Sequence, residues 1–293
     1  MNDESVKCMV EGNDGNIYIG TVHGLLSYDP KKMTVSIPHE ILRDELCISL
    51  YRDSRDRIWV GTFYNGAFCM DGTDVRHYVY SESSVDMSYR QSSPNLNCVR
   101  SFLEDSQGRF WISVYGGVGR FDPQTGNITL LRDSHKELDR FMIVRDICEL
   151  PDGNLLMSGD NGRFLYSPSD DKVLTDLNTQ DNLIQTNQAM TDSRGLLWMA
   201  TSDGLEIRNM KNGSIYRVDS RNGLPAGNIM SLALDNSGNV WASSFSYISR
   251  IRAISDGKDG YTFAVATYGK EDGVESGAFF QKSVLKDSQG RVY

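Results

Sequence analysis

Hydrophobic stretches alternate along this chain with short polar turns at a nearly constant distance. An apolar stretch leads into a turn that ends on glycine, or on aspartate in one copy, and a second apolar stretch follows. Apolar residues are adjacent in these second stretches, as is typical of strands buried on both faces. Because the turn residue supplies the left-handed backbone of a tight hairpin, the pattern predicts β-hairpins. No stretch has convincing helical periodicity. The turn positions are Gly15, Asp56, Gly108, Gly153, Gly195, Gly238 and Gly290.

Three columns of residues recur around these turns. The position three residues after the turn is aromatic or Leu, and we expect its tryptophans in the core rather than stacked on a sugar. A small residue two positions later is expected to let neighbouring sheets converge near an axis. An aspartate three residues before the turn is expected to accept backbone N–H bonds. The columns are Tyr18, Trp59, Trp111, Leu156, Trp198, Trp241 and Tyr293; Gly20, Gly61, Ser113, Ser158, Ala200 and Ser243; and Asp53, Asp105, Asp192, Asp235 and Asp287.

The unit repeats about every 46 residues, which is the period of a propeller blade. The sequence predicts an all-β fold, a seven-bladed β-propeller of four-stranded antiparallel blades, in one domain over residues 1–293. The blade repeats start near residues 5, 46, 98, 143, 185, 228 and 280. The last copy reaches only its second strand, so we expect an incomplete seventh blade beside the first, and a longer gene product or a truncated one. The long spacers 80–97 and 255–277 are expected to be loop-like, the second with a hairpin turn at 256–260.

Charge and composition exclude several classes of protein. The net charge is −9, which disfavours binding to a phosphate backbone, so no nucleic-acid contact is expected. The longest apolar run, residues 196–200, is far shorter than the roughly 20 residues of a membrane span. The N-terminus has no signal-peptide pattern. The five cysteines form no close pair and are expected to be buried free thiols; they are Cys8, Cys47, Cys69, Cys98 and Cys148.

No motif for catalysis or for a metal ion stands out. The four histidines fall in different repeats, and no zinc-protease, serine-hydrolase or nucleotide-binding motif occurs. His23 is the only histidine expected near the axis, and a solvated turn residue is the simpler interpretation. The turn aspartates lack a second carboxylate at ligand spacing in most copies, whereas calcium takes six to eight oxygens. We therefore predict no metal and no cofactor.

Polar residues in the innermost strands and in the turns after the second strands form a candidate ligand site at the channel mouth. The cations there suit an anionic ligand such as an acidic oligosaccharide, and the tyrosines can stack on a sugar face. Alternatively, these residues line a water-filled channel and bond to one another. If the mouth is the site, replacing Arg100 and Arg145 by alanine abolishes binding. The candidates are Lys7, Tyr64, Asn65, Arg100, Tyr115, Arg145, Asn187, Gln188, Asp203, Tyr247 and Lys282.

Several stretches resemble the two-component regulator propeller. They are DSRDRIWVGT at 53–62, DSQGRFWI at 105–112, DSRGLLWMAT at 192–201, NGLP at 222–225, the run from Asn228 to Trp241, and DGVESGAFF at 272–280 before DSQG at 287–290. The fourth copy departs, since it lacks both the aspartate and the tryptophan.

The resemblance implies the periplasmic sensor region of a bacterial hybrid two-component system, responding in many members to oligosaccharides. Such regions usually contain two propeller rings, and a β-sandwich, a membrane helix and kinase modules follow. The implied partners are therefore those domains, a homodimer through the full receptor, and an oligosaccharide. Kinase activity is not assigned to this chain, which we expect not to be an enzyme.

Three functional hypotheses remain open. The first is a propeller that senses a ligand or relays binding made elsewhere to a kinase. The second is an interaction scaffold without a small ligand. The third, which the absence of a catalytic constellation disfavours, is a propeller enzyme such as a lyase or lactonase. Fold alone does not choose among them.

Overall fold

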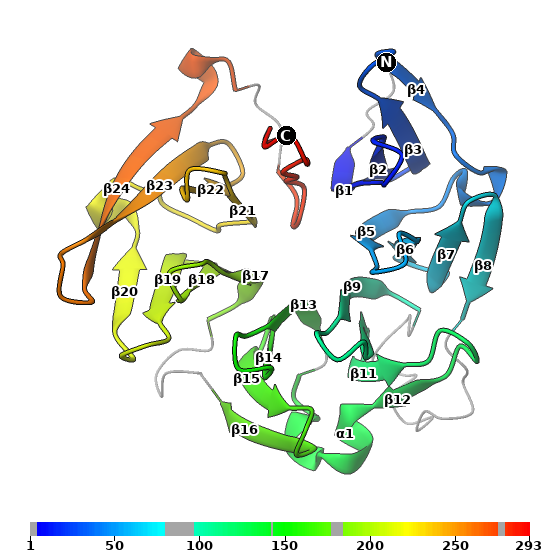
Figure 1. Ribbon diagram of the computed structural model, residues 1–293, viewed down its shortest axis with the longest axis horizontal. Helices are drawn as coiled ribbons and strands as arrows, with labels where there is room; N and C mark the ends of the chain where they lie inside the picture. Colours follow the sequence, from blue (N-terminus) through cyan, green and yellow to red (C-terminus); the bar gives the residue numbers. More distant parts are fainter. Residues whose placement is uncertain (1–4, 80–96, 142, 177–183, 275–278) are drawn as a thin grey trace.

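Six four-stranded antiparallel sheets stand around a central axis in the computed structural model of the chain (Figure 1). The structure describes residues 5–79, 97–141, 143–176, 184–274 and 279–293. Within each sheet the strands follow chain order, and the first strand lies next to the axis (Figure 1). The expected all-β propeller architecture is confirmed.

The first three blades contain twelve strands. Blade one has β1 (Val6–Glu11), β2 (Ile17–Thr21), β3 (Gly24–Asp29) and β4 (Thr34–Ser36). Blade two has β5 (Cys47–Arg52), β6 (Ile58–Thr62), β7 (Ala67–Asp71) and β8 (Asp74–Tyr78). Blade three has β9 (Val99–Glu104), β10 (Phe110–Val114), β11 (Gly117–Phe121) and β12 (Ile128–Leu130). A single helical turn, α1 (Leu131–Ser134), follows β12.

The next three blades contain the remaining strands. Blade four has β13 (Val144–Glu149), β14 (Leu155–Gly159), β15 (Gly162–Ser167) and β16 (Lys172–Asp176). Blade five has β17 (Thr186–Thr191), β18 (Leu196–Thr201), β19 (Gly204–Asn209) and β20 (Ile215–Val218). Blade six has β21 (Ser231–Leu234), β22 (Val240–Ser243), β23 (Ile248–Ser255) and β24 (Tyr261–Tyr268). Short 3₁₀ turns occur at Glu40–Leu42, Lys136–Leu138, Ser220–Asn222 and Lys270–Asp272.

The C-terminal segment 279–293 lies in the gap between blade six and blade one (Figure 1). Its isolated bridge joins Lys286 and Val292, the same register that pairs Arg52 with Ile58 in blade two. The hydroxyl and the backbone N–H of Ser288 donate to the Glu11 carboxylate, with 2.6 Å between the Ser288 N and the Glu11 Oε2. Since this segment begins the first hairpin of a further blade, the ring is compatible with seven blades.

The same serine–glutamate contact clasps other neighbouring blades on the side of the Asp-x-x-Gly turns. Ser54 of blade two binds Glu104 of blade three, and Ser106 of blade three binds Glu149 of blade four. In each case the hydroxyl and the N–H of the serine after the turn aspartate reach both carboxylate oxygens. The segment at Ser288 therefore meets blade one as an ordinary blade meets its neighbour.

The expected core columns are largely confirmed. Trp59, Trp111 and Trp198 are fully buried, and each faces the next blade, as Trp59 does against Phe102 and Phe110. Trp241 is only half-buried, because it faces the C-terminal segment across an apolar cavity of about 380 Å³.

The small-residue column also has the expected role. A Cβ on Gly61 would lie 2.1 Å from the Ser49 hydroxyl and 2.5 Å from the Val99 carbonyl of blade three. Only glycine therefore fits where blade two meets the innermost strand of blade three. At the one turn without glycine, Asp56 adopts a φ of 64°, which is the left-handed conformation expected there.

One expectation for the spacers is wrong. The segment 255–277 was expected to be loop-like, yet residues 261–268 form β24, which pairs with β23 along its whole length. The hairpin turn at 256–260 is confirmed, since the Asp256 N–H donates to the Gly260 carbonyl. The other spacer, 80–97, lies outside the described residues apart from Asn97.

Candidate functional site

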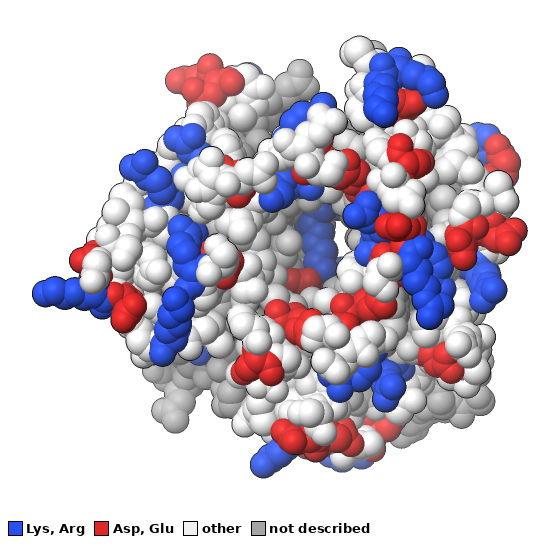
Figure 2. Space-filling model, in the orientation of Figure 1, with Lys and Arg blue, Asp and Glu red and all other residues white. Residues whose placement is uncertain are grey.

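The innermost strands surround an axial channel, and Figure 2 shows an opening at the centre of the ring with basic side chains in it. Lys282 of the C-terminal segment reaches across this space. Its Nζ lies 2.5 Å from the Asp146 Oδ1 of blade four and donates to the Ser101 hydroxyl of blade three at 2.8 Å. Asp146 is almost wholly buried, so the lysine charge is matched inside the channel.

Arg145 is engaged in the same way. Its guanidinium pairs with Asp160 on blade four, and its Nη1 donates to the Gln281 Oε1 at 3.2 Å. The Gln281 amide in turn donates to the backbone carbonyls of Arg145 and Asn187. Gln281 was not among the predicted residues, although it directly precedes the predicted Lys282 in the seventh copy of the repeat.

Two further predicted residues hold blades together. Asn187 is fully buried and donates to the Ile229 carbonyl at 2.7 Å, and the Gln188 Oε1 accepts the Leu232 N–H at 2.7 Å. Both bonds run from blade five to blade six. Lys282, Arg145, Asn187 and Gln188 are thus all bonded to other groups of the protein.

The two other cations lie against aromatic rings. The Lys7 Nζ lies 3.0 Å from the centroid of the Phe280 ring. The Arg100 guanidinium lies 5.7 Å from the centroid of Phe63. Within the described part of the chain, the buried Nε of Arg100 has no hydrogen-bond partner.

The turn residues of the predicted mouth are more open. Tyr64 and Tyr247 are 58% and 44% exposed, and Tyr115 is half-buried. The Asn65 amide donates to the Glu45 carboxylate at 2.9 Å. The side chains of Asp203 and His23 are exposed in their turns, as expected for His23.

A second region was not predicted from the sequence. A cleft of about 900 Å³ opens between blades two and three, on the side of the Asp-x-x-Gly turns, opposite the predicted mouth. We call it the arginine groove. Its arginines are Arg55, Arg57, Arg76, Arg109 and Arg120; its acids are Asp71, Asp74, Glu104 and Asp122; the other lining residues are Cys69, Gly108, Phe110, Phe121, Pro123, Gln124, Thr125, Asn127 and Thr129.

A turn aspartate holds one wall of the groove in place. The Asp53 Oδ1 accepts the N–H groups of Arg55 and Arg57, and its Oδ2 accepts the Arg57 Nε at 2.7 Å and the Trp59 Nε1 at 2.8 Å. Burial opposes ionisation, but the bonds from Trp59 and Arg57 outweigh it and lower the pKa of Asp53. Asp105 holds Arg109 and Trp111 in the same arrangement.

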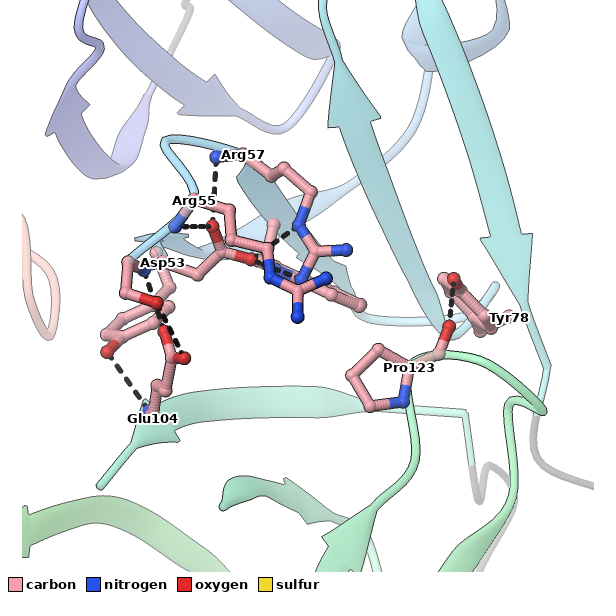
Figure 3. A network of polar contacts seen from close by, with 9 residues as sticks. Asp53, Arg55, Arg57, Tyr78, Glu104 and Pro123 are labelled. Atoms are coloured by element: carbon pink, nitrogen blue, oxygen red, sulfur yellow. Dashed lines mark hydrogen bonds and ion pairs between the residues drawn. The ribbon is translucent and has the colours of Figure 1, made fainter. Parts of the chain in front are cut away.

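Figure 3 shows the side chains of Arg55 and Arg57 leaving this turn on the same side, toward the loop that contains Pro123. The Tyr78 hydroxyl donates to the Pro123 carbonyl at 2.8 Å and so ties the outer strand of blade two to blade three. Among the described residues, no ion pair or side-chain hydrogen bond is recorded for the guanidinium groups of Arg55, Arg76 or Arg120, all of which are exposed residues. The groove thus contains cations that the protein itself leaves available.

In the part of the chain that the structure describes, no three His, Cys, Asp or Glu side chains gather as a metal site would require. Nor does it contain a helix of the length and apolar character that a bilayer crossing needs. Burial raises the pKa of the Cys69 thiol to about 11, so this groove residue stays protonated at neutral pH.

The fold and its repeated turns define a β-propeller. Residues 42–64 and 93–116 match the model of the two-component regulator propeller family. The chain therefore contains two-component regulator propeller repeats, and the resemblance drawn from its sequence is confirmed. Among curated protein sequences, none matches the chain significantly.

Solved structures share the fold over the whole chain. The extracellular domain described for a hybrid two-component system, BT3049 from B. thetaiotaomicron, is 22% identical with a TM-score of 0.82, covering 100% of this chain and 38% of its own. A catalytically inactive virginiamycin B lyase from Staphylococcus aureus is 12% identical with a TM-score of 0.71, covering 97% and 89%. A streptogramin B lyase is 13% identical with a TM-score of 0.68, covering 100% and 90%. This chain thus spans well under half of the first of these proteins.

Proposed function

We propose that this chain is an extracytoplasmic propeller of a hybrid two-component sensor kinase, which senses an oligosaccharide or relays its binding. The observation that carries the proposal is the match of two repeats to the two-component regulator propeller. The similarity in fold to an extracellular domain described for such a system adds support. Periplasmic localisation, kinase partners and a receptor dimer belong to the same proposal.

Two surfaces are candidates for the saccharide. The predicted channel mouth presents the exposed rings of Tyr64 and Tyr247, which suit stacking on a sugar face. The arginine groove, on the opposite side, presents arginines around a cleft of about 900 Å³. A ligand at either place would signal only by favouring one arrangement of the receptor domains over another.

A thermal-shift profile of this chain against neutral and acidic oligosaccharides tests the proposal. A ligand present at ~100 times its dissociation constant stabilises the folded state by about 2.7 kcal/mol, which shifts the melting temperature measurably. We expect at least one saccharide to do so. A flat profile across the panel contradicts saccharide sensing by this chain and favours the interaction scaffold.

The enzyme hypothesis is tested on the same panel. The fold similarity to two lyases is a similarity of architecture, which many unrelated functions share. We expect each saccharide to be recovered unchanged after prolonged incubation with the protein. Turnover of a stabilising saccharide, seen by chromatography, would replace the sensor proposal with a catalytic one.

A further inference from the structure

We propose that the arginine groove binds an oligosaccharide carrying carboxylate or sulfate groups, with Arg55 and Arg76 as the residues that hold the acid group. This inference rests on the proposed function and gives it a binding site and a ligand class. Three features of the groove carry it: its cations, its size, and the neutral and acidic groups among them.

The cations come first. Arg57 is committed to Asp53, whereas Arg55 and Arg76 line the same cleft with no ion pair recorded among the described residues. Figure 3 shows Arg55 and Arg57 on the same side of one turn, where the Asp53 carboxylate binds the guanidinium of Arg57 but the backbone N–H of Arg55. Guanidinium groups present forked N–H donors that match the geometry of carboxylate and sulfate oxygens. An anionic group in the groove would therefore relieve the repulsion between these arginines.

The size of the groove suits a saccharide. A volume of about 900 Å³ lies within the range of small-molecule sites, which is roughly 300–1,000 Å³. Buried side chains of Cys69, Phe110 and Phe121 reach its lining. Such apolar surface suits the C–H face of a sugar ring, whereas a hydrated inorganic anion gains nothing from it.

The acidic and amide side chains of the groove suit a ligand that carries hydroxyl groups. Asp71 at the end of β7, Asp74 at the start of β8 and Asn127 before β12 are exposed residues of the groove lining. Carboxylates there repel a simple polyanion but accept hydrogen bonds from sugar hydroxyls, which donate readily. Glu104 does not compete for the arginines, because both of its oxygens accept bonds from Ser54. A groove with one hydrogen-bonded carboxylate, exposed carboxylates and exposed arginines fits an acidic sugar better than a phosphate-like ion.

The channel mouth is a weaker candidate for this acid group. Lys282 is paired with Asp146, and Arg145 with Asp160. A ligand carboxylate there must displace an existing partner and leave a carboxylate of the protein without its cation. In the groove, Arg55 and Arg76 are available without such a rearrangement.

Calorimetric titration of the whole chain tests the inference with four probes: linear trigalacturonate, a disulfated disaccharide, neutral galactotriose, and sodium sulfate. We expect the two acidic saccharides to bind and the neutral sugar and sulfate to bind far more weakly. The relative affinity of the first two probes distinguishes carboxylate from sulfate recognition. Equal binding of galactotriose, or binding of sulfate alone, overturns the inference.

Variants locate the site. The double variant R55A/R76A should weaken the acidic saccharide by about a hundredfold, because each arginine supplies charge-assisted hydrogen bonds. R55K/R76K should recover part of the affinity. The matched control is Arg217→Ala, an exposed arginine on the outer strand β20 of blade five, which should bind unchanged. An unchanged melting temperature verifies that the variants fold.

The outcomes separate this inference from the proposed function. If an acidic saccharide binds but R55A/R76A binds it as tightly as the parent, the groove is not the site, while saccharide sensing stands. If only galactotriose binds, the ligand class is wrong and sensing again stands. If none of the saccharides binds here but one in the thermal-shift panel does, the inference alone fails. If none binds in either experiment, saccharide sensing by this chain fails as well.

Discussion

Lys282 in the axial channel and Arg55 in the arginine groove are both cations of the propeller, but their surroundings differ. Lys282 reaches a buried carboxylate on blade four and a hydroxyl on blade three. Arg55 is exposed at a turn and lines an open cleft. A buried charge must be paired to be tolerated, whereas an exposed one need not be. Lys282 therefore stabilises the ring, whereas Arg55 remains available to a ligand.

The comparison shows why a cluster of charges in a sequence does not by itself identify a binding site. The inner-strand column places Arg145 and Lys282 near the axis, where the structure does bring them. Two aspartates of blade four pair with these cations: Asp146 with Lys282, and Asp160 with Arg145. What marks a ligand site is the balance of donors and acceptors after folding, which differs between these two regions.

The largest effect is expected at the residue on which the groove is built. Replacing Asp53 by alanine removes the acceptor for Arg57, Trp59 and two backbone N–H groups. The free energy of unfolding should fall by about 3 kcal/mol, since a buried paired charge is lost and its partners are left. Urea denaturation measures it. The exposed Asp71→Ala serves as control and should change stability by less than about 0.5 kcal/mol; equal losses would contradict this role for Asp53.

A direct contrast between the two regions is the next largest. Lys282→Met should cost about 2 kcal/mol, because Asp146 then stays buried without its cation. Arg55→Ala should cost less than about 0.5 kcal/mol, as an exposed side chain does. Urea denaturation of the two single variants measures these losses. The double variant Lys282→Met/Asp146→Asn then tests the coupling between Lys282 and Asp146. The account is wrong if the groove substitution proves the more destabilising.

The acid dependence of stability should follow the turn aspartates. Burial opposes the ionisation of Asp53 and Asp105, but their tryptophan and arginine donors outweigh it and lower both pKa values. A lowered folded-state pKa contributes stability above the unfolded value of about 3.9, and this stability is lost as pH falls through the folded-state pKa. We expect denaturation midpoints to be flat near neutrality and to drop below about pH 4. Asp53→Asn should show a smaller drop; an identical pH profile would contradict the assignment.

A modest loss of stability is expected at the clasps between blades. Ser54→Ala beside the groove removes the hydroxyl bond to Glu104, and Ser288→Ala removes the matching hydroxyl bond to Glu11, while the backbone N–H bonds remain. These contacts are solvent-exposed, so each loss should be about 0.5–1 kcal/mol. Thermal denaturation compares the pair. A much larger loss for Ser288→Ala would indicate that the contact of the C-terminal segment with blade one differs from an ordinary blade contact.

Much of the fold could be predicted from the sequence because every copy of the repeat carries its own local signals. The turn residue, the aspartate before it and the aromatic after it act within one hairpin, so their spacing is visible in the chain. The spacer 255–277 shows the limit of this reasoning. Its excess length predicts a loop, but residues 261–264 alternate in exposure as an outer strand does, and β23 is long enough to pair with all of residues 261–268.

The candidate site could be predicted only in part. The sequence predicts that Arg145, Lys282 and Asn187 lie near the axis. It does not predict the carboxylate and amide groups with which they pair in the folded protein. The arginine groove was missed because its residues come from two blades and stand outside the repeated columns. The sequence does contain one signal: Arg57 and Arg109 each follow a turn aspartate by four residues and precede the tryptophan by two. That spacing predicts the Asp–Arg–Trp arrangement, although not the cleft beside it.

The most direct test of the account compares the two regions in one calorimetric experiment. Trigalacturonate is titrated into the parent chain, into R55A/R76A from the groove, and into R100A/R145A from the channel mouth. We expect the groove variant to lose about a hundredfold in affinity and the mouth variant to bind as the parent does. Loss of binding in R100A/R145A with full affinity in R55A/R76A would place the saccharide at the channel mouth and contradict the account.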